Sequence, residues 1–138
     1  MAFSFLALTL IWNSSTGLEG GQDSYMHYLF SRYSWSHPHL FLDQWGKPVF
    51  TLLSSPFSQL GINGLVLFNL FCLLFTGYYS YKICKSLSVS IPELAFVFVV
   101  FAPIAFGRSI SGLTEPLNAL LVALMLFFFV KDKNNTSS

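Results

Sequence analysis

The chain has 138 residues, of which 54% are hydrophobic, 18% aromatic and only 9% charged, and its mean hydropathy is +0.60. Soluble domains carry about 25% charged residues, so this composition excludes an ordinary soluble domain and predicts an all-α integral membrane protein with about four transmembrane helices. The net charge of +1 excludes a nucleic-acid partner, because binding to a phosphate backbone requires a strongly basic surface.

The N-terminal segment predicts a first transmembrane helix over residues 1–16. The apolar run at residues 2–12 covers only about half of a bilayer, so the helix must extend through residues 13–16 to cross it. The segment has no basic n-region, which a signal peptide requires. A translation start placed too late in the gene is another explanation for its shortness.

A long polar loop at residues 17–61 follows, and we expect it to carry interfacial amphipathic helices. It contains two of the three tryptophans and all three histidines. Its first part has a helical repeat that gives two faces. The apolar face holds Met26, Leu29, Phe30 and Tyr33, and the polar face holds Asp23, His27, Ser31 and Ser34. A helix of this kind is expected to lie in the membrane interface with its rings at headgroup depth.

Two roles are open for Asp23, which stands just before this helical stretch. As an N-cap residue, its carboxylate would accept hydrogen bonds from free backbone N–H groups, which is worth about 1 kcal/mol. As a catalytic residue, the same carboxylate would take a proton from an acceptor hydroxyl at the membrane surface. The two roles are compatible, because a capping carboxylate is held in a fixed place.

The histidines raise the question of a metal site. His27, His37 and His39 could act as ligands with Asp23 or Asp43, but their spacing fits no strong metal motif. Surface histidines that bind nothing are the competing interpretation.

Three further transmembrane helices are predicted at residues 62–81, 89–106 and 114–130, the last of them a little short. Two lysines follow the first of these helices, and two more begin the tail at residues 131–138. The positive-inside rule places these lysines in the cytoplasm. The polar loop and the link at residues 107–115 then lie together on the extracytoplasmic side.

The link and the loop both carry candidate phosphate ligands. Pro116 suits the first turn of a helix, and an acid such as Glu115 is favoured there by the helix dipole. A charge this close to the hydrocarbon is nevertheless costly and usually has a purpose. Arg108 could pair with Glu115 or bind a lipid phosphate. Lys47, directly before Pro48, could hold a phosphate as a point charge or be an exposed loop lysine.

Three motifs follow one another along the chain. They are QDSYMHYLFSRYSW with its Asp23, WGKPVFTLLSSPFSQLG with its Lys47, and SGLTEPL at residues 111–117. In this order they resemble the N-terminal part of a GT-C-type membrane glycosyltransferase, of the protein-mannosyltransferase and polyprenyl-phosphate-sugar group. The resemblance covers nearly the whole chain. Many members carry a second acid directly after the first, where this chain has Ser24.

The resemblance implies transfer of a mannose-like hexose from a polyprenyl-phosphate carrier to an extracytoplasmic acceptor, with inversion at the anomeric carbon. Asp23 would be the catalytic base, or would help to hold a divalent metal ion, with His27 as a second candidate ligand. Such a reaction needs a carboxylate near the acceptor oxygen and positive charge near the departing phosphate. The candidate substrate- and phosphate-binding residues are Lys47, Arg108, Arg32, Glu115 and His27.

Members of that group are several times longer, so this chain is expected to be an N-terminal fragment that is inactive alone. The alternative is a small non-catalytic membrane subunit, or scaffold, whose helices pack on a partner through small residues such as Gly64 and Gly77. A transporter or channel fragment is least favoured, because the predicted spans carry no central charge.

Overall fold

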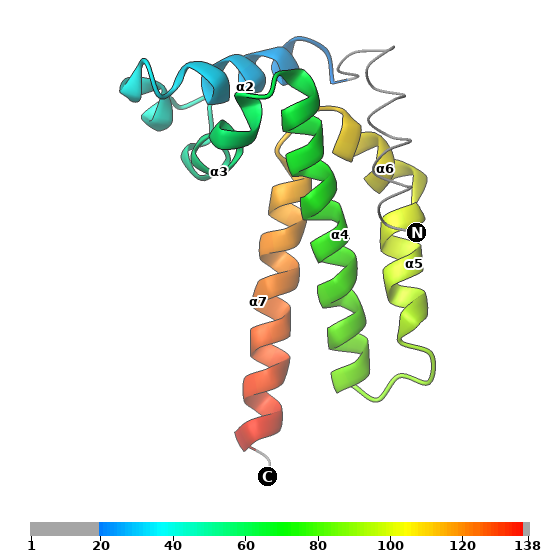
Figure 1. Cartoon of the computed structure of the whole chain (residues 1–138). Helices are drawn as coiled ribbons and strands as arrows, with labels where there is room; N and C mark the ends of the chain where they lie inside the picture. Colours follow the sequence, from blue (N-terminus) through cyan, green and yellow to red (C-terminus); the bar gives the residue numbers. More distant parts are fainter. Residues whose placement is uncertain (1–19, 137–138) are drawn as a thin grey trace.

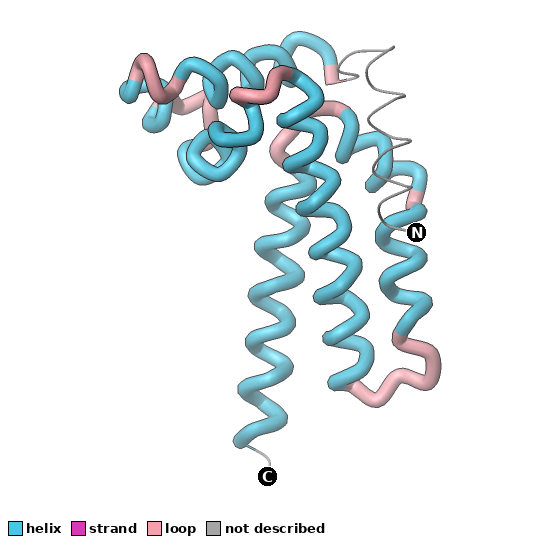
Figure 2. Tube along the Cα trace, viewed as in Figure 1, coloured by secondary structure: helices cyan, strands magenta, loops and turns pink. Residues whose placement is uncertain are grey.

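The computed structural model describes residues 20–136, and the regular elements in that range are all helices. Figure 1 shows long helical segments that run side by side and a layer of shorter helices across one end. Figure 2 shows how short the loops between them are. The all-α prediction is confirmed, whereas the predicted first helix at residues 1–16 lies outside the described residues.

The long segments contain α4 (Ile62–Ser86), α5 (Glu93–Phe101), α6 (Pro103–Ile110) and α7 (Glu115–Thr136). α4 is central and packs against α7 on one side and against α5 on the other. α6 follows α5 directly but is bent from it by 55°. Pro103 accounts for this bend, because proline begins α6 without a backbone N–H and disfavours a helical conformation in the residue before it.

The end layer contains α2 (Gly21–Tyr33), the 3₁₀ helix η1 (Pro38–Leu42) and α3 (Pro48–Ser58). α2 packs on α3, and α3 packs on α4. Both α2 and α3 lie across the upper ends of the long helices in Figure 1, rather than alongside them. The stretch predicted as a polar loop is therefore largely helical.

Polar contacts fasten α2 to α3. The hydroxyl groups of Ser31 and Ser54 are 2.7 Å apart. Arg32 Nη1 donates to the carbonyl oxygens of Ser58 at 3.1 Å and Gln59 at 3.2 Å. Gln59 Nε2 donates in return to the Arg32 carbonyl oxygen at 2.9 Å. Hydrogen bonds of this kind contribute about 1 kcal/mol each, and somewhat more where a charge takes part, so the two helices form one unit.

The two predicted faces of α2 are present, and the polar face is the one that is buried. His27, Ser31 and Ser34 of the predicted polar face are buried. Met26, Leu29 and Tyr33 of the predicted apolar face are exposed, whereas Phe30 is half-buried. Asp23 departs from the rest of its predicted face because it is exposed. A soluble protein buries the apolar face of such a helix. The reversed arrangement suits a helix whose outer surface contacts lipid.

The hydrophobic core lies where the end layer meets the upper half of α4. Phe50 of α3 packs with Leu65 and Phe68 of α4 and with Leu117 of α7. Tyr28 of α2 contacts this cluster and also a second one formed by α4 and α6. Burial of a side chain of this size is worth about 1.5–3 kcal/mol, so the core holds the end layer in place on the long helices.

Close approaches to α4 depend on glycine. A Cβ atom on Gly64 would lie 1.9 Å from the carbonyl oxygen of Phe57 in α3. A Cβ atom on Gly77 would lie 2.9 Å from Val100 Cγ2 and 3.0 Å from Phe96 Cδ2 in α5. These two glycines therefore pack against helices of the same chain, and a partner subunit would need a different surface.

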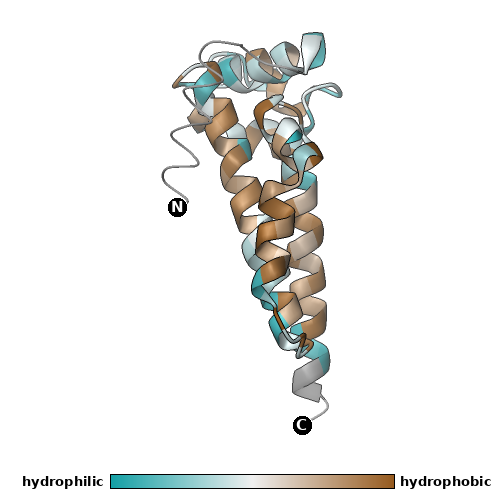
Figure 3. Cartoon of the chain, turned by 90° about the vertical axis from the view of Figure 1, so that its right-hand side faces the viewer, coloured by the Kyte–Doolittle hydropathy of each residue, from teal (hydrophilic) through white to brown (hydrophobic). Residues whose placement is uncertain are grey.

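Hydropathy separates the long helices from both ends. Figure 3 shows hydrophobic residues along the middle of the long helices and hydrophilic residues in the end layer and near the opposite end. Among the described helices, α4 alone is long and apolar enough to cross a membrane, and α5 with α6 qualifies only if the bent pair is counted as one span. The structure thus supports one or two of the four predicted spans.

The helix ends differ from the predicted span ends. α4 continues beyond residue 81 through its lysines, and Lys82 Nζ lies 5.5 Å from the centroid of the Tyr78 ring. The span predicted at residues 89–106 is divided between two helices, and α7 runs on past residue 130. Lysine is a good helix former, so positive charge marks the end of an apolar stretch but not the end of a helix.

Candidate functional site

Asp23 lies in the first turn of α2, and its predicted role as the N-cap residue is wrong. Gly20 occupies the N-cap position, and no side chain among the described residues caps α2. Gly20 lies close to Ser24 of α2 and to the link between α6 and α7. A Cβ atom there would lie 2.6 Å from the Ser111 carbonyl oxygen. The carboxylate of Asp23 is exposed near the helix N-terminus, where the helix dipole favours an acid.

His27 lies one turn further along α2 and is only 6% exposed. Its ring packs edge-on against Phe50, with the ring centroids 5.5 Å apart. Nδ1 has no hydrogen-bond partner within the part of the chain that the structure describes. Burial lowers the pKa of His27 below its usual value of 6.5, so the imidazole is neutral near pH 7.

Charged groups from three separate segments also influence the pKa of this imidazole, less than burial does. Asp23 and Glu115 act to raise the pKa of His27, whereas Lys47 acts to lower it. Asp23 belongs to α2, Lys47 immediately precedes α3, and Glu115 begins α7. The segments that carry these four residues all lie at the end of the molecule where the end layer meets the long helices.

Lys47 has a backbone conformation that lysine rarely adopts. Its φ angle is 53°, in the left-handed region that favours glycine, and its side chain is exposed. The Lys47 carbonyl accepts a hydrogen bond from Thr51 N at 3.0 Å, and the Thr51 hydroxyl donates to the carbonyl of the buried Gly46. Strained residues of this kind persist where the surroundings hold them, and they are common in functional sites.

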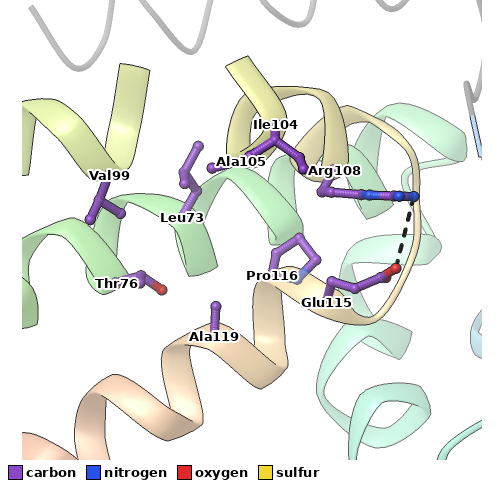
Figure 4. Close-up of a pocket in the computed structure, with 9 residues that line it drawn as sticks. All are labelled: Leu73, Thr76, Val99, Ile104, Ala105, Arg108, Glu115, Pro116 and Ala119. Atoms are coloured by element: carbon purple, nitrogen blue, oxygen red, sulfur yellow. Dashed lines mark ion pairs between the residues drawn. The ribbon is translucent and has the colours of Figure 1, made fainter. Parts of the chain in front are cut away.

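Arg108 and Glu115 form the ion pair that the sequence suggested, with 3.9 Å between Arg108 Nη1 and Glu115 Oε1. Both side chains are about half exposed, so the pair contributes little to stability. Figure 4 shows the pair at the edge of a cavity of about 170 Å³. The cavity lies between α4, the α5–α6 bend and α7, and its other lining residues are Leu73, Thr76, Val99, Ile104, Ala105, Pro116 and Ala119.

Arg32 has a different position from the other candidates. Its guanidinium is bound to the end of α3 and lies 5.9 Å from the centroid of the Tyr28 ring. The structure therefore gives Arg32 a role in holding α2 against α3. Its contacts are with α3 and with its own helix.

The remaining histidines lie apart from His27. His37 and His39 are exposed at η1, with ring centroids 6.0 Å apart. Asp43 accepts a hydrogen bond from Trp45 N at 2.8 Å and so fixes the following turn. Within residues 20–136, no three side chains of histidine, cysteine or acid type are grouped as metal ligands. Asp23 and His27, spaced i and i+4, would supply one oxygen and one nitrogen donor, and a metal ion would need further ligands besides them.

Asn69 of α4 is a site residue whose role the sequence did not predict. It is fully buried, and its Nδ2 donates to the Leu113 carbonyl oxygen at 2.9 Å, which ties α4 to the link before α7. Its Oδ1 and the hydroxyl of Ser24 have no hydrogen-bond partner among the described residues. A buried amide side chain in an apolar helix costs free energy unless it is hydrogen-bonded. An asparagine within an apolar run is therefore the sequence signal that could have identified Asn69.

No protein-family model, curated protein or solved structure matches the chain. Its chemistry must therefore be argued from its own residues. The site offers an exposed carboxylate, a neutral imidazole, a lysine and an arginine–glutamate pair beside an apolar cavity. Such a set can accept a proton and stabilise an anion that carries an apolar tail.

Proposed function

We propose that this chain is part of a membrane glycosyltransferase that moves a mannose-like hexose from a polyprenyl-phosphate carrier to an extracytoplasmic acceptor. The observation that carries the proposal is the Arg108–Glu115 pair, 3.9 Å apart at the edge of an apolar cavity, at the same end of the molecule as Asp23 of α2 and Lys47 before α3. These residues come from three segments that are distant in the sequence. They are also the segments on which the resemblance to GT-C-type enzymes depends.

In this reaction, Asp23 acts as the base. It takes the proton from the acceptor hydroxyl as that oxygen forms a bond to the anomeric carbon, and the bond from that carbon to the carrier phosphate breaks. Lys47 and Arg108 stabilise the negative charge of the departing phosphate. A divalent metal ion held in part by Asp23 and His27 would supply further positive charge there. The neutral imidazole of His27 suits that role, because a metal ligand must be deprotonated.

The arrangement in the membrane follows the charge pattern. Four helices cross the bilayer, with the end layer extracytoplasmic and the lysines at the opposite end of α4 and α7 in the cytoplasm. The hydrophobic middle of the long helices supports this arrangement, as does the exposed apolar face of α2.

The test is a donor-binding assay on the purified chain in phospholipid vesicles, with radiolabelled polyprenyl-phosphate mannose as donor. Lys47→Gln is expected to weaken donor binding at least tenfold, because a hydrogen bond to a charged group is worth about 1.5–3 kcal/mol. Lys85→Gln, at the opposite end of α4, is the charge-matched control and should bind normally. Asp23→Asn should bind the donor within twofold of the unaltered chain.

Transfer separates the roles of these residues. In a longer enzyme that carries the same three motifs, the substitution equivalent to Asp23→Asn should abolish sugar transfer while leaving donor binding intact. If Lys47→Gln and Lys85→Gln weakened donor binding equally, the loss would reflect the total positive charge of the chain and not a phosphate site at Lys47. If the variant equivalent to Asp23→Asn transferred sugar at the normal rate, that carboxylate would not be the catalytic base.

A further inference from the structure

A second, open hollow adjoins the apolar cavity, between the start of α2 and α6. Its lining residues are Gly20, Ile104, Gly107, Arg108 and Ser111. Ile104 and Arg108 line the apolar cavity as well, and Figure 4 shows both side chains on α6 beside that cavity. Residues spaced i and i+4 are neighbours on a helix surface, so these two side chains form a ridge between the hollow and the cavity.

The helical repeat of α6 separates the two spaces. Ala105 lines only the cavity, and Gly107 lines only the hollow. With 3.6 residues in each turn, these two positions lie about 80° to either side of the ridge formed by Ile104 and Arg108. A ligand that crosses this ridge therefore meets the cavity on one side, the guanidinium of Arg108 in the middle and the hollow on the other side.

The chemistry of the hollow differs from that of the cavity. The cavity has mainly apolar walls, and Glu115 lies at its edge. In the hollow, Gly20 and Gly107 present backbone without a Cβ atom, and Ser111 adds a hydroxyl group. Among the described residues that line the hollow, Arg108 is the only charged one. A second phosphate would need a cation of its own, so the hollow suits a polar group without charge.

We propose that this hollow binds the hexose of the polyprenyl-phosphate donor, with the donor phosphate at Arg108 and the first part of the polyprenyl chain in the apolar cavity. The inference rests on the proposed function, and it adds the place of each part of the donor. An apolar chain, one anionic phosphate and a neutral sugar follow each other in the donor. The cavity, the ridge and the hollow follow each other in the same order.

The start of α2 supplies hydrogen-bonding groups beside the hollow. Gly20 is the N-cap residue, and no side chain within the described residues caps the helix. The first N–H groups of a helix have no partner inside it, so they are free to donate to sugar hydroxyls. The hydroxyl of Ser24 is fully buried, has no hydrogen-bond partner in the described part of the chain, and lies where it would clash with a Cβ atom on Gly20. A ligand hydroxyl at Gly20 would offset the cost of this unsatisfied group.

The hollow is also close to the proposed base. Asp23 follows Gly20 by three residues, which is a rise of about 4.5 Å along the helix and places both on the same side of it. In an inverting transfer, the base acts on the face of the sugar ring opposite the leaving group. Asp23 belongs to α2 and Arg108 to α6, so the two groups reach the hollow from different helices.

The experiment compares two ligands on the purified full chain in vesicles. One is polyprenyl-phosphate mannose, and the other is polyprenyl methyl phosphate, in which a methyl group replaces the sugar and the phosphate keeps the same single charge. The unaltered chain should bind the mannose donor at least tenfold more tightly. Gly107→Phe should fill the hollow and abolish this difference, while binding of the methyl analogue stays within twofold. A Cβ atom at Gly107 meets nothing within 4 Å, so the fold admits the ring.

Two further variants are the controls. Ala105→Phe places the same ring in the cavity, and it should weaken binding of both ligands at least fivefold. Val97→Phe, on the exposed surface of α5, should change neither. Binding of the methyl analogue by Gly107→Phe also shows that this variant is folded.

Cysteine labelling gives a second measurement that needs no large side chain. In a chain with Cys72 and Cys84 replaced by serine, Gly107→Cys is treated with a maleimide in detergent. The mannose donor should slow the reaction at least fivefold, and the methyl analogue should leave its rate within twofold. Equal protection by both ligands, or protection by neither, would overturn the proposal.

The binding results separate this inference from the proposed function. If the unaltered chain binds the donor and the methyl analogue equally, or if Gly107→Phe weakens both to the same extent, the chain binds the carrier but the hollow is not the sugar site. If the unaltered chain binds neither ligand, the proposed function itself fails, and this inference fails with it.

Discussion

At the residue scale, His27 combines burial with the charges of three segments. The folded chain holds its imidazole neutral, because burial lowers its pKa below 6.5. In the unfolded chain the imidazole regains its usual pKa and binds a proton more readily. Protonation therefore favours the unfolded state, and stability rises with pH wherever the unfolded state binds more protons.

We predict that the thermal unfolding midpoint in detergent is constant from pH 8 to 7 and falls as the pH decreases from 6.5 to 5. The unfolded imidazole gains its proton near pH 6.5, so the stability that the neutral form provides is present above that pH and is lost below it. Circular dichroism during heating measures the midpoint. His27→Gln should flatten this slope, whereas His39→Gln, in the exposed η1, should keep it. An unchanged slope in His27→Gln would assign the effect to other groups.

Lys47 yields a prediction about strain. Its φ angle of 53° costs about 1 kcal/mol or more for a residue with a Cβ atom, and glycine avoids that cost. Lys47→Gly is therefore expected to raise the free energy of unfolding by about 1 kcal/mol while weakening donor binding. Lys85→Gly, in the last turn of α4, relieves no such strain and should leave the free energy of unfolding unchanged or lower it by up to about 1 kcal/mol. Denaturant unfolding monitored by circular dichroism checks both. A loss of stability in Lys47→Gly would show that the lysine side chain itself supports the turn.

At the element scale, the contact between α3 and α4 is set by a single missing side chain. The Phe57 carbonyl oxygen occupies the space that a Cβ atom on Gly64 would need. Backbone atoms fill this space, so α3 as a whole would have to move to admit a methyl group. The position of Lys47 depends on α3, and thus the candidate site depends on this glycine.

Gly64→Ala is expected to destabilise the chain by about 1–3 kcal/mol, the usual cost of overpacking. Gly107→Ala is the matched control, because a Cβ atom there meets nothing within 4 Å. It should be neutral or stabilising by up to about 1 kcal/mol, since alanine is the better helix former. Thermal unfolding of the two variants measures the difference. Similar values for both would mean that α3 can shift away from α4 at little cost.

At the scale of the whole molecule, the end layer and the α4–α5 loop lie at opposite ends of the long helices. The proposed arrangement puts a bilayer between them. The two ends should then be accessible to reagents from opposite sides of a sealed membrane.

Cysteine labelling tests this arrangement. Ser36→Cys, in the end layer, should react with a membrane-impermeant maleimide in intact cells. Ser90→Cys, in the α4–α5 loop, should react only after permeabilisation, and both variants are made with Cys72 and Cys84 replaced by serine. Reaction of both sites from the same side would contradict the membrane arrangement.

Sequence reasoning predicted the all-helical fold and the start of α4, and it named an ion pair with Glu115 as one of two roles for Arg108. These features follow from local signals, namely apolar runs, proline positions and the spacing of charges. It did not predict the burial of His27 or the bond from Asn69 to Leu113. Both depend on how α2 and the link pack against α4, which no local pattern specifies. The N-cap role of Asp23 was wrong because α2 begins earlier than the sequence pattern indicates, with Gly20 as the N-cap residue.

The length of α7 has a consequence for the surrounding lipid. Its uncharged stretch at residues 116–130 spans about 22 Å, against about 30 Å for a typical hydrocarbon core. If α7 crosses the bilayer as proposed, this hydrophobic mismatch is relieved by local thinning or by lysines that reach outward to the surface. Thinning would draw the two headgroup planes together around α7 and bring phosphates closer to Arg108. Membranes of short-chain lipids should therefore accommodate this protein better than thick, sterol-rich ones.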